Sequence, residues 1–311
     1  MCNFKRGLSA DLVKSLNEEY ERGGWWQALV DDPQLFIAVR DDYLNVYWKG
    51  NSLLRLFLQN GRLVGEVHYK YLLRPEINGN PYLRFEGGKV QSVNPADLFF
   101  SDLSSIASLK RAADVHAEGE KKGVHKIVMS NHNIMDVEIA FGTENEQSGA
   151  KVAQRIDFAA LRLESHGPEL KFYEAKRFNN PELRADGEQV PPVLSQLKKY
   201  KDFLRSCESD LIASYRKVCG NLVSLSGFEK RFSMHSLLND IAKGELPLSI
   251  NPDVRLAVFG YDRDQDKGDI WATHLEKLES CLKTLCPNAG TLLLKKGDPK
   301  GFTNGISSPA R

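Results

Sequence analysis

The stretch RIDFAALRLESHGPELKFYEAKRF, residues 155–178, decides the predicted fold. Two largely apolar runs flank turn residues at positions 165–168, a pattern that indicates a β-hairpin. Because successive strand residues alternate between the two faces of a sheet, Asp157, Glu174 and Lys176 can point the same way. We therefore expect two carboxylates and an ammonium group on one side of this hairpin.

Carboxylates within apolar runs indicate an ion pair or a metal site, because burying an ionised side chain is costly unless it pairs or binds a metal. Mg²⁺ suits such a pair, since one or two carboxylates hold it while water and substrate phosphate complete its shell. A lysine two residues beyond Glu174 could position or deprotonate the attacking water, or offset charge in the transition state. The alternative is a surface hairpin whose Glu–Lys pair adds only a few tenths of a kcal/mol.

At these residues the chain resembles the PD-(D/E)XK, or restriction-endonuclease-like, nuclease superfamily over about residues 124–296. The match is Asp157, a gap of sixteen residues, and then Glu174-Ala175-Lys176; Ile156 stands where the family's proline would be. The resemblance implies an α/β domain with a mixed β-sheet flanked by helices, and α+β architecture for the chain as a whole. It also implies catalytic roles for Asp157, Glu174 and Lys176.

A helix predicted downstream of the hairpin carries QLKKY, residues 196–200, which is similar to the Gln-x-x-x-Tyr element of RecB-type nucleases. Gln196 and Tyr200 are four residues apart and so share one helix face. The resemblance implies that they orient the site and contact the substrate backbone. Lys199 and Arg184 are expected to contact nucleic-acid phosphates, and a solvated helix face is the alternative.

A third carboxylate is expected from IMDVEIAF, residues 134–141. Its alternation predicts a strand with apolar residues on one face and Asp136 and Glu138 on the other. Glu138 resembles the upstream acid of the family, Asp136 is its rival, and an edge strand with solvated acids remains the alternative to both. The implied metal is Mg²⁺, with Mn²⁺ as a substitute, and its implied ligands are Glu138, Asp157, Glu174 and the Ala175 carbonyl.

The domain organisation is read from pattern changes along the 311 residues. Residues 1–122 are predicted to form a β-rich domain, because four apolar strands between 35 and 69 are separated by hairpin turn residues. Its aromatic and basic residues suit either base stacking or ordinary cross-strand packing. Residues 123–296 are assigned to the nuclease-like domain. Residues 297–311, rich in Gly, Pro and Ser, are predicted to be a disordered tail.

Composition narrows the classes of function. No apolar run approaches the roughly 18 residues of a membrane span, and the N-terminus lacks the apolar core of a signal peptide. The five cysteines are odd in number without a Cys-x-x-Cys pair, so we expect a reduced, cytoplasmic protein. A net charge of +1 argues against a chain-wide electrostatic grip on nucleic acid. The phosphate-binding loop of ATP-driven motors is missing from the sequence.

The expectation for function is a Mg²⁺-dependent nuclease that hydrolyses phosphodiester bonds, with DNA favoured over RNA as partner and, by family analogy, a 5′-phosphate product. One alternative is a nuclease-fold protein that binds nucleic acid or a partner with little or no cleavage. Another is that residues 1–122 recognise a partner that directs the C-terminal half. A homodimer also stays open, since nothing in the sequence marks an interface.

Overall fold

A computed structural model describes residues 4–68, 82–87, 89–90, 106–141, 154–187, 189–286, 291–303 and 306. Backbone contacts divide the chain into two compact units. We call Lys5–His125 with Ala213–Glu245 the meander unit, and Met1–Phe4 with Lys126–Ile212 and Leu246–Arg311 the hairpin unit. The sequence predicted a single boundary after residue 122. In the structure the chain changes unit after His125, and a segment of 33 residues returns to the N-terminal unit.

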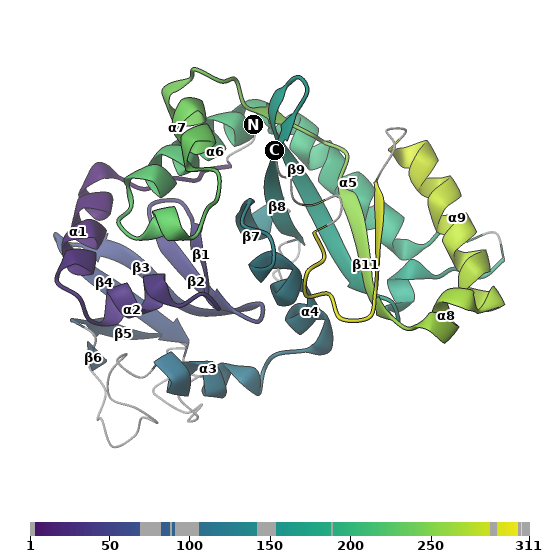
Figure 1. Ribbon diagram of the computed structural model, residues 1–311, viewed down its shortest axis with the longest axis horizontal. Coiled ribbons are helices and arrows are strands. Elements are labelled where there is room, and N and C mark those ends of the chain that lie inside the picture. Colours follow the sequence, from purple (N-terminus) through teal and green to yellow (C-terminus); the bar gives the residue numbers. More distant parts are fainter. Residues whose placement is uncertain are drawn as a thin grey trace, which may run out of the picture. The chain divides into compact units, whose positions relative to one another are not determined.

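The meander unit is built on an antiparallel sheet in the order β1-β2-β3-β4-β5-β6 (Figure 1). Two-residue turns set its register: Trp48 pairs with Asn51 and Gln59 with Arg62. Asn60 and Gly61 both have positive φ, as a type I′ hairpin turn requires. The strands are β1 (Phe36–Val39), β2 (Leu44–Trp48), β3 (Asn51–Gln59), β4 (Arg62–His68), β5 (Tyr82–Glu86) and β6 (Lys89–Val90).

Helices complete the meander unit. Ser9 caps α1 by accepting a hydrogen bond from the Leu12 amide, and Leu12 and Leu16 are fully buried. The helices lying wholly within the unit are α1 (Ala10–Glu21), α2 (Trp25–Asp31), α3 (Ile106–Asp114), η4 (Phe228–Lys230) and α7 (His235–Lys243). The unit boundaries fall inside α4 (Gly119–Met129) and α6 (Glu208–Ser224).

Arg231 explains why the segment after residue 213 belongs with the N-terminal half. Its guanidinium donates hydrogen bonds of 2.7–3.2 Å to four backbone carbonyls at the end of α2, those of Leu29, Val30, Asp32 and Leu35. Burial lowers its pKa to about 10, against the opposing charges of Asp32 and Asp31. Carbonyls left unpaired at a helix C-terminus need such donors. The returning segment thus supplies a cap to a helix two hundred residues earlier.

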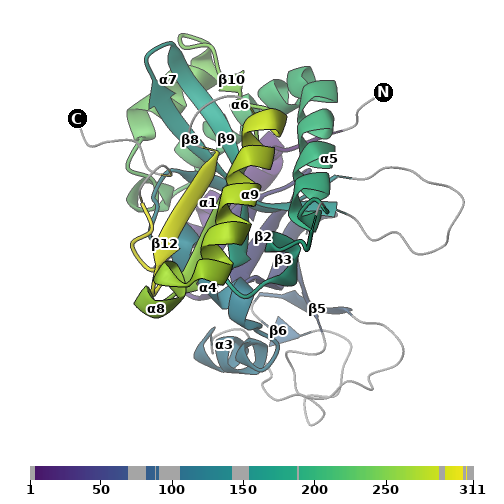
Figure 2. The same ribbon diagram turned by 90° about the vertical axis from the view of Figure 1, so that its right-hand side faces the viewer.

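The hairpin unit contains a mixed sheet in the order β12-β11-β9-β8-β7, with β10 pairing alongside β9. The first three strands of this unit, β7, β8 and β9, are antiparallel neighbours, whereas β11 runs parallel to both β9 and β12. Figure 2 shows the sheet with β12 and α9 toward the viewer. The strands are β7 (Ile134–Phe141), β8 (Gln154–Glu164), β9 (Gly167–Arg177), β10 (Ser249–Ile250), β11 (Arg255–Tyr261) and β12 (Leu292–Lys296).

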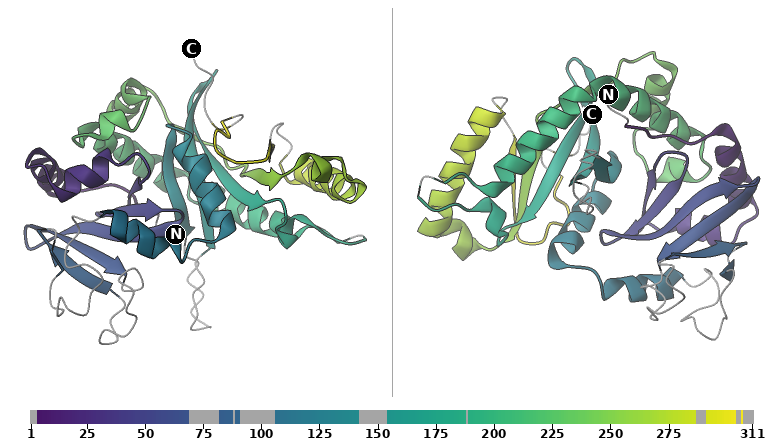
Figure 3. Two further views of the ribbon diagram at one scale, coloured as in Figure 1. Left: turned by 60° about the horizontal axis from the view of Figure 1, so that its bottom comes forward. Right: turned by 180° about the vertical axis from the view of Figure 1, so that it is seen from behind.

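The helices of the hairpin unit follow β9 and β11 in the chain. They are η3 (Pro181–Leu183), α5 (Pro192–Ser206), α8 (Arg263–Lys267) and α9 (Asp269–Leu285). Two of them, α5 and α9, are in contact, and the right-hand view of Figure 3 shows them next to each other. Proline occupies the first turn of α5, where the missing N–H would have no intrahelical partner.

Three sequence expectations need correction. The disorder predicted for residues 297–311 does not extend to Phe302 and Ile306, which are buried and whose carbonyls accept hydrogen bonds from Asn131 and Asn133; most of residues 304–311 lie outside the described part. Among the described cysteines, Cys219, Cys281 and Cys286 are free but Cys207 is disulfide-bonded, so full reduction does not hold. The strict alternation predicted for residues 134–141 is broken, because a bulge lies between Ile134 and Asp136.

The fold class is therefore mixed α/β, with one antiparallel and one mixed sheet. Within the described residues, none of the helices is both long and apolar enough to cross a membrane.

Candidate active site

The hairpin forms at the predicted place. Glu164 pairs with Gly167 across a two-residue turn, and the ladder runs to the pair Phe158–Tyr173. Asp157 and Glu174 are the next residues beyond the end of this ladder, and the charge of Glu174 acts on the Asp157 carboxyl. On the other side of β8, the pairs Val137–Phe158 and Ile139–Ile156 set Glu138 opposite Asp157. The three predicted carboxylates thus occupy one row across three adjacent strands.

Asp157 is half-buried, and one of its carboxylate oxygens accepts a 2.7 Å hydrogen bond from the Ala175 amide on β9. Burial and then the charge of Glu174 raise the pKa of Asp157 well above its ordinary value, although the Ala175 amide opposes them. The charge of Glu138 adds to this repulsion. Because the two neighbouring carboxylates repel each other when ionised, a cation bound between them would be stabilised.

Lys176 connects the carboxylate pair to a second element. Its ammonium group lies 2.9 Å from a Glu174 oxygen and 2.7 Å from an oxygen of Glu182 in η3. Burial alone would lower the pKa of Lys176, but the charge of Glu174 and the hydrogen bonds to Glu182 and Glu174 raise it above its ordinary value. Lys176 is therefore a cation near neutral pH. As a cation it can offset negative charge or orient a neighbouring group.

Tyr200 and Gln196 meet on one face of α5, as their spacing predicts. The Gln196 amide donates to the Tyr200 hydroxyl, which in turn donates to the Arg155 carbonyl at 2.6 Å. Burial, and next the charge of Glu174, raise the pKa of Tyr200 above its ordinary value, so the hydroxyl remains protonated. Tyr200 is 1% exposed and its ring packs edge-on against Phe141 at 5.3 Å. These contacts fix α5 to β8 two residues before Asp157.

The structure separates the two rivals for the third carboxylate. Asp136 is 1% exposed and one of its oxygens accepts a hydrogen bond from the amide of Val137. Glu138 is partly exposed, lies 3.4 Å from the Arg155 guanidinium, and adopts a φ of 49° that non-glycine residues rarely take in a strand. The ladder pairs Asp136 with Ala159, whereas Glu138 lies between the two pairs that flank Asp157, and its charge acts on that carboxylate.

Two predicted phosphate contacts lie elsewhere. The Arg184 guanidinium donates to the carbonyls of Phe178 and Asn180 at 2.7 and 3.1 Å and stacks 4.9 Å from the Phe178 ring. It therefore holds the turn after β9 together. Lys199 is exposed on α5. A contact of either residue with nucleic acid stays a prediction.

Sequence reasoning assigned no role to Glu182. The signal was present in NNPEL, residues 179–183, where an Asn-Pro turn follows directly after the strand that carries Lys176. Such a turn reverses the chain, so its polar residues come back toward the end of that strand.

The donor set can be tested against Mg²⁺. Groups of three or more His, Cys, Asp or Glu side chains close enough to hold a metal are not found in the described part of the chain. Mg²⁺ needs fewer, since one or two carboxylates suffice when water and substrate supply the remaining oxygens. Asp157 and Glu174, with the Ala175 carbonyl, are the residues that would supply such a set. Across the site, four carboxylates (Glu138, Asp157, Glu174, Glu182) face two cations (Arg155, Lys176), an excess of two negative charges when all are ionised.

A scan against protein-family models, a search of curated proteins and a search of solved structures each returned no match.

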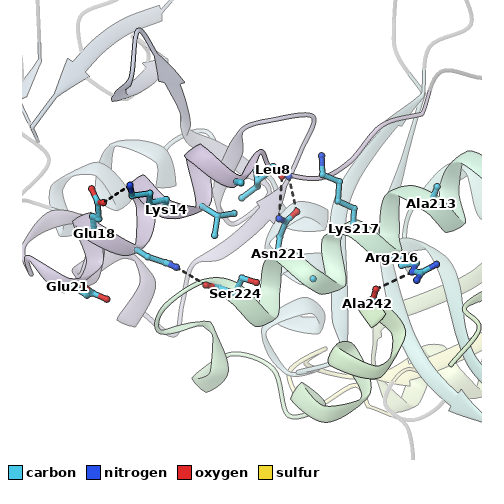
Figure 4. Close-up of a pocket in the computed structure, with 14 residues that line it drawn as sticks. Leu8, Lys14, Glu18, Glu21, Ala213, Arg216, Lys217, Asn221, Ser224 and Ala242 are labelled. Carbon is cyan, nitrogen blue, oxygen red and sulfur yellow. Dashed lines mark hydrogen bonds and ion pairs between the residues drawn. The ribbon is translucent and has the colours of Figure 1, made fainter. Parts of the chain in front are cut away.

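A separate pocket of about 830 Å³ lies in the meander unit between α1, α6 and α7 (Figure 4). Several of its polar side chains are used within the fold: Lys14 pairs with Glu18, Asn221 bonds the Leu8 backbone, and Arg216 donates to the Ala242 carbonyl. The rest of the lining mixes small and apolar residues with Asn17, Glu21, Lys217 and Ser224.

Proposed function

We propose that the protein is a Mg²⁺-dependent nuclease of the PD-(D/E)XK type that hydrolyses phosphodiester bonds, with DNA as the favoured substrate. The observation that carries this proposal is the cross-strand row of Glu138, Asp157 and Glu174 with Lys176 beside it. Support also comes from the strand order, because an antiparallel β7-β8-β9 meander extended by the parallel β11 matches the mixed sheet expected from the resemblance.

In this proposal Asp157, Glu174 and the Ala175 carbonyl hold the metal ion, with Glu138 at the edge of the site. When bound, Mg²⁺ would supply Lewis-acid stabilisation of the phosphodiester and acidify a water molecule. A water oxygen attacks phosphorus in line with the 3′ oxygen, the P–O3′ bond breaks, and the products carry a 5′-phosphate and a 3′-hydroxyl. The Lys176 ammonium offsets the negative charge that grows on the phosphoryl oxygens.

The other residues act on geometry. Tyr200 ties the Arg155 carbonyl to α5, which limits movement of β8 near Asp157. Small displacements of catalytic groups lower rates strongly, so this support contributes to catalysis without contact to the reacting atoms. Recognition of a partner through residues 1–122, and the formation of a homodimer, stay separate predictions.

The test is a substrate panel. Labelled duplex DNA, single-stranded DNA and RNA are incubated with the wild type and with Asp157→Asn in Mg²⁺, Mn²⁺ or EDTA, and product ends are mapped with a phosphatase and a ligase. We expect metal-dependent products with 5′-phosphates from DNA, lost in EDTA and in the variant. Binding of all three substrates with no cleavage in either metal would favour the binding-protein alternative.

A further inference from the structure

The turn after β9 places a second carboxylate on the ammonium of Lys176. Glu182 contacts Lys176 at 2.7 Å, slightly closer than the 2.9 Å contact with Glu174. The two partners differ in exposure, since the side chain of Glu174 is 3% exposed and that of Glu182 is 46% exposed. Lys176 is therefore held from two directions, one inside the sheet and one at the surface.

The element that carries Glu182 is built to hold its place. Asn180 accepts a 2.9 Å hydrogen bond from the Glu182 amide, and Pro181 begins the 3₁₀ helix. Arg184 bridges two carbonyls of the preceding turn, and Leu183 is fully buried. A glutamate on a mobile loop would contribute little to an ion pair, because ordering it costs side-chain entropy. Here the backbone of η3 is already fixed by these contacts.

Glu174 has competing demands on its carboxylate. It is a ligand in the proposed metal site and also the inner partner of Lys176. A metal ion bound to Glu174 would neutralise part of its negative charge, which would weaken the attraction between Glu174 and Lys176. Glu182 avoids that conflict, because it contacts Lys176 and is not one of the proposed metal ligands.

We propose that Glu182 is a positioning residue that keeps the Lys176 ammonium beside the carboxylate pair while Glu174 serves the metal site. This inference rests on the proposed nuclease function. It assigns to Glu182 an effect on the chemical step that passes through Lys176, with no contribution to metal binding.

The experiment compares Glu182→Gln and Glu182→Asp with a matched control. Glu229→Gln is suitable, because Glu229 is likewise the middle residue of a 3₁₀ helix, η4, and is exposed. Single-turnover cleavage of duplex DNA is measured across a Mg²⁺ titration, in wild-type and Lys176→Met backgrounds. A second readout, independent of cleavage, is the rate at which an amine-acylating reagent labels Lys176, followed by mass spectrometry.

We expect Glu182→Gln to lower the maximal rate by about tenfold to 100-fold, as loss of transition-state charge stabilisation would. Half-saturating Mg²⁺ and melting temperature should stay unchanged, and Glu182→Asp should restore part of the rate. In the Lys176→Met background the substitution should have almost no further effect, since both changes break one interaction. Lys176 should be labelled faster in Glu182→Gln than in wild type, and unchanged in Glu229→Gln.

Three results would overturn the inference: a shift in half-saturating Mg²⁺ of about tenfold or more, which would make Glu182 a ligand; multiplying losses in the double variant; or unchanged labelling of Lys176. Failure of the proposed function looks different. If the wild type cleaves nothing while Glu182→Gln still accelerates labelling, Glu182 holds the lysine but the assigned chemistry is wrong.

Discussion

The hydroxyl of Tyr200 donates a 2.6 Å hydrogen bond to the main-chain carbonyl of Arg155. This contact joins a helix to the strand that carries Asp157, across 45 residues of sequence. The four-residue spacing puts Gln196 and Tyr200 on the same face of α5, and Tyr200 bonds the backbone of β8 there. The pair therefore acts by holding β8 in position.

Replacing Tyr200 by phenylalanine tests this link. The ring packing against Phe141 remains, but the Arg155 carbonyl and the Gln196 amide lose their partner. We expect a loss of about 1–2 kcal/mol in the free energy of unfolding, measured by urea denaturation. Tyr20→Phe is the control, because the two hydrogen bonds of its hydroxyl, to Asp31 and from Lys230, are both exposed. Equal losses of stability in the two variants would mean that the buried Tyr200 hydrogen bond stabilises the fold no more than an exposed one.

Arg231 provides a prediction for the meander unit. Arg231→Met removes all four bonds to the carbonyls that follow α2, and we expect a loss of about 2–4 kcal/mol in stability. Denaturation followed by tryptophan fluorescence measures this change. Arg216→Met removes a single exposed bond to the Ala242 carbonyl and should leave stability nearly unchanged. A small effect of Arg231→Met would argue that residues 213–245 are held to this unit by other contacts.

His125 gives the stability of the protein a pH dependence. Burial, assisted by the charges of Lys49 and Lys110, lowers its pKa from 6.5 to about 4, while a backbone hydrogen bond to Gln34 opposes the shift. The unfolded chain therefore takes up the proton first as pH falls. Stability should decrease from about pH 6.5 down to about pH 4, by at most about 1.4 kcal/mol per pH unit.

Substitution isolates this contribution. His125→Phe keeps an aromatic ring at the edge of Trp48, which lies 5.3 Å away, but cannot be protonated. Unfolding free energies measured across this pH range should become flatter in that variant and keep their wild-type slope in His235→Gln, a change of an exposed histidine. An unchanged slope in His125→Phe would assign the pH dependence to other groups.

Metal binding can be followed without any substrate. A ligand that binds only the folded state raises the melting temperature, so Mg²⁺ should stabilise the wild type relative to EDTA. Glu174→Gln should abolish this increase, because one of the two carboxylates is lost. Glu276→Gln, a substitution on α9 away from the carboxylate row, should retain it. Equal stabilisation of all three proteins would indicate metal binding elsewhere.

The hairpin and its site residues were predictable because the pattern is local. Strand alternation and the turn at Ser165 and His166 set the register of β8 and β9, and this ladder ends one residue before Asp157 and Glu174. The helix spacing of Gln196 and Tyr200 is equally local. The α/β class followed from these elements, whereas assignment to one nuclease fold still depends on the resemblance.

Features that depend on distant contacts were not predictable. The β-bulge between Ile134 and Asp136 cannot be read from the alternating sequence, and neither can the burial of Asp136. The return of residues 213–245 to the N-terminal unit depends on bonds such as that between Asn221 and Leu8, which are 213 residues apart.

The central claim is that the Asp157–Glu174–Lys176 constellation cleaves phosphodiester bonds. Its most direct test is single-turnover cleavage of end-labelled duplex DNA in Mg²⁺ by the wild type, Glu174→Gln and Lys176→Met, with Glu169→Gln as a control at the far end of the same strand. We expect cleavage by the wild type and the control, and a loss of about 100-fold or more in the other two. Equal cleavage by all four proteins, or cleavage that persists in EDTA, would contradict it.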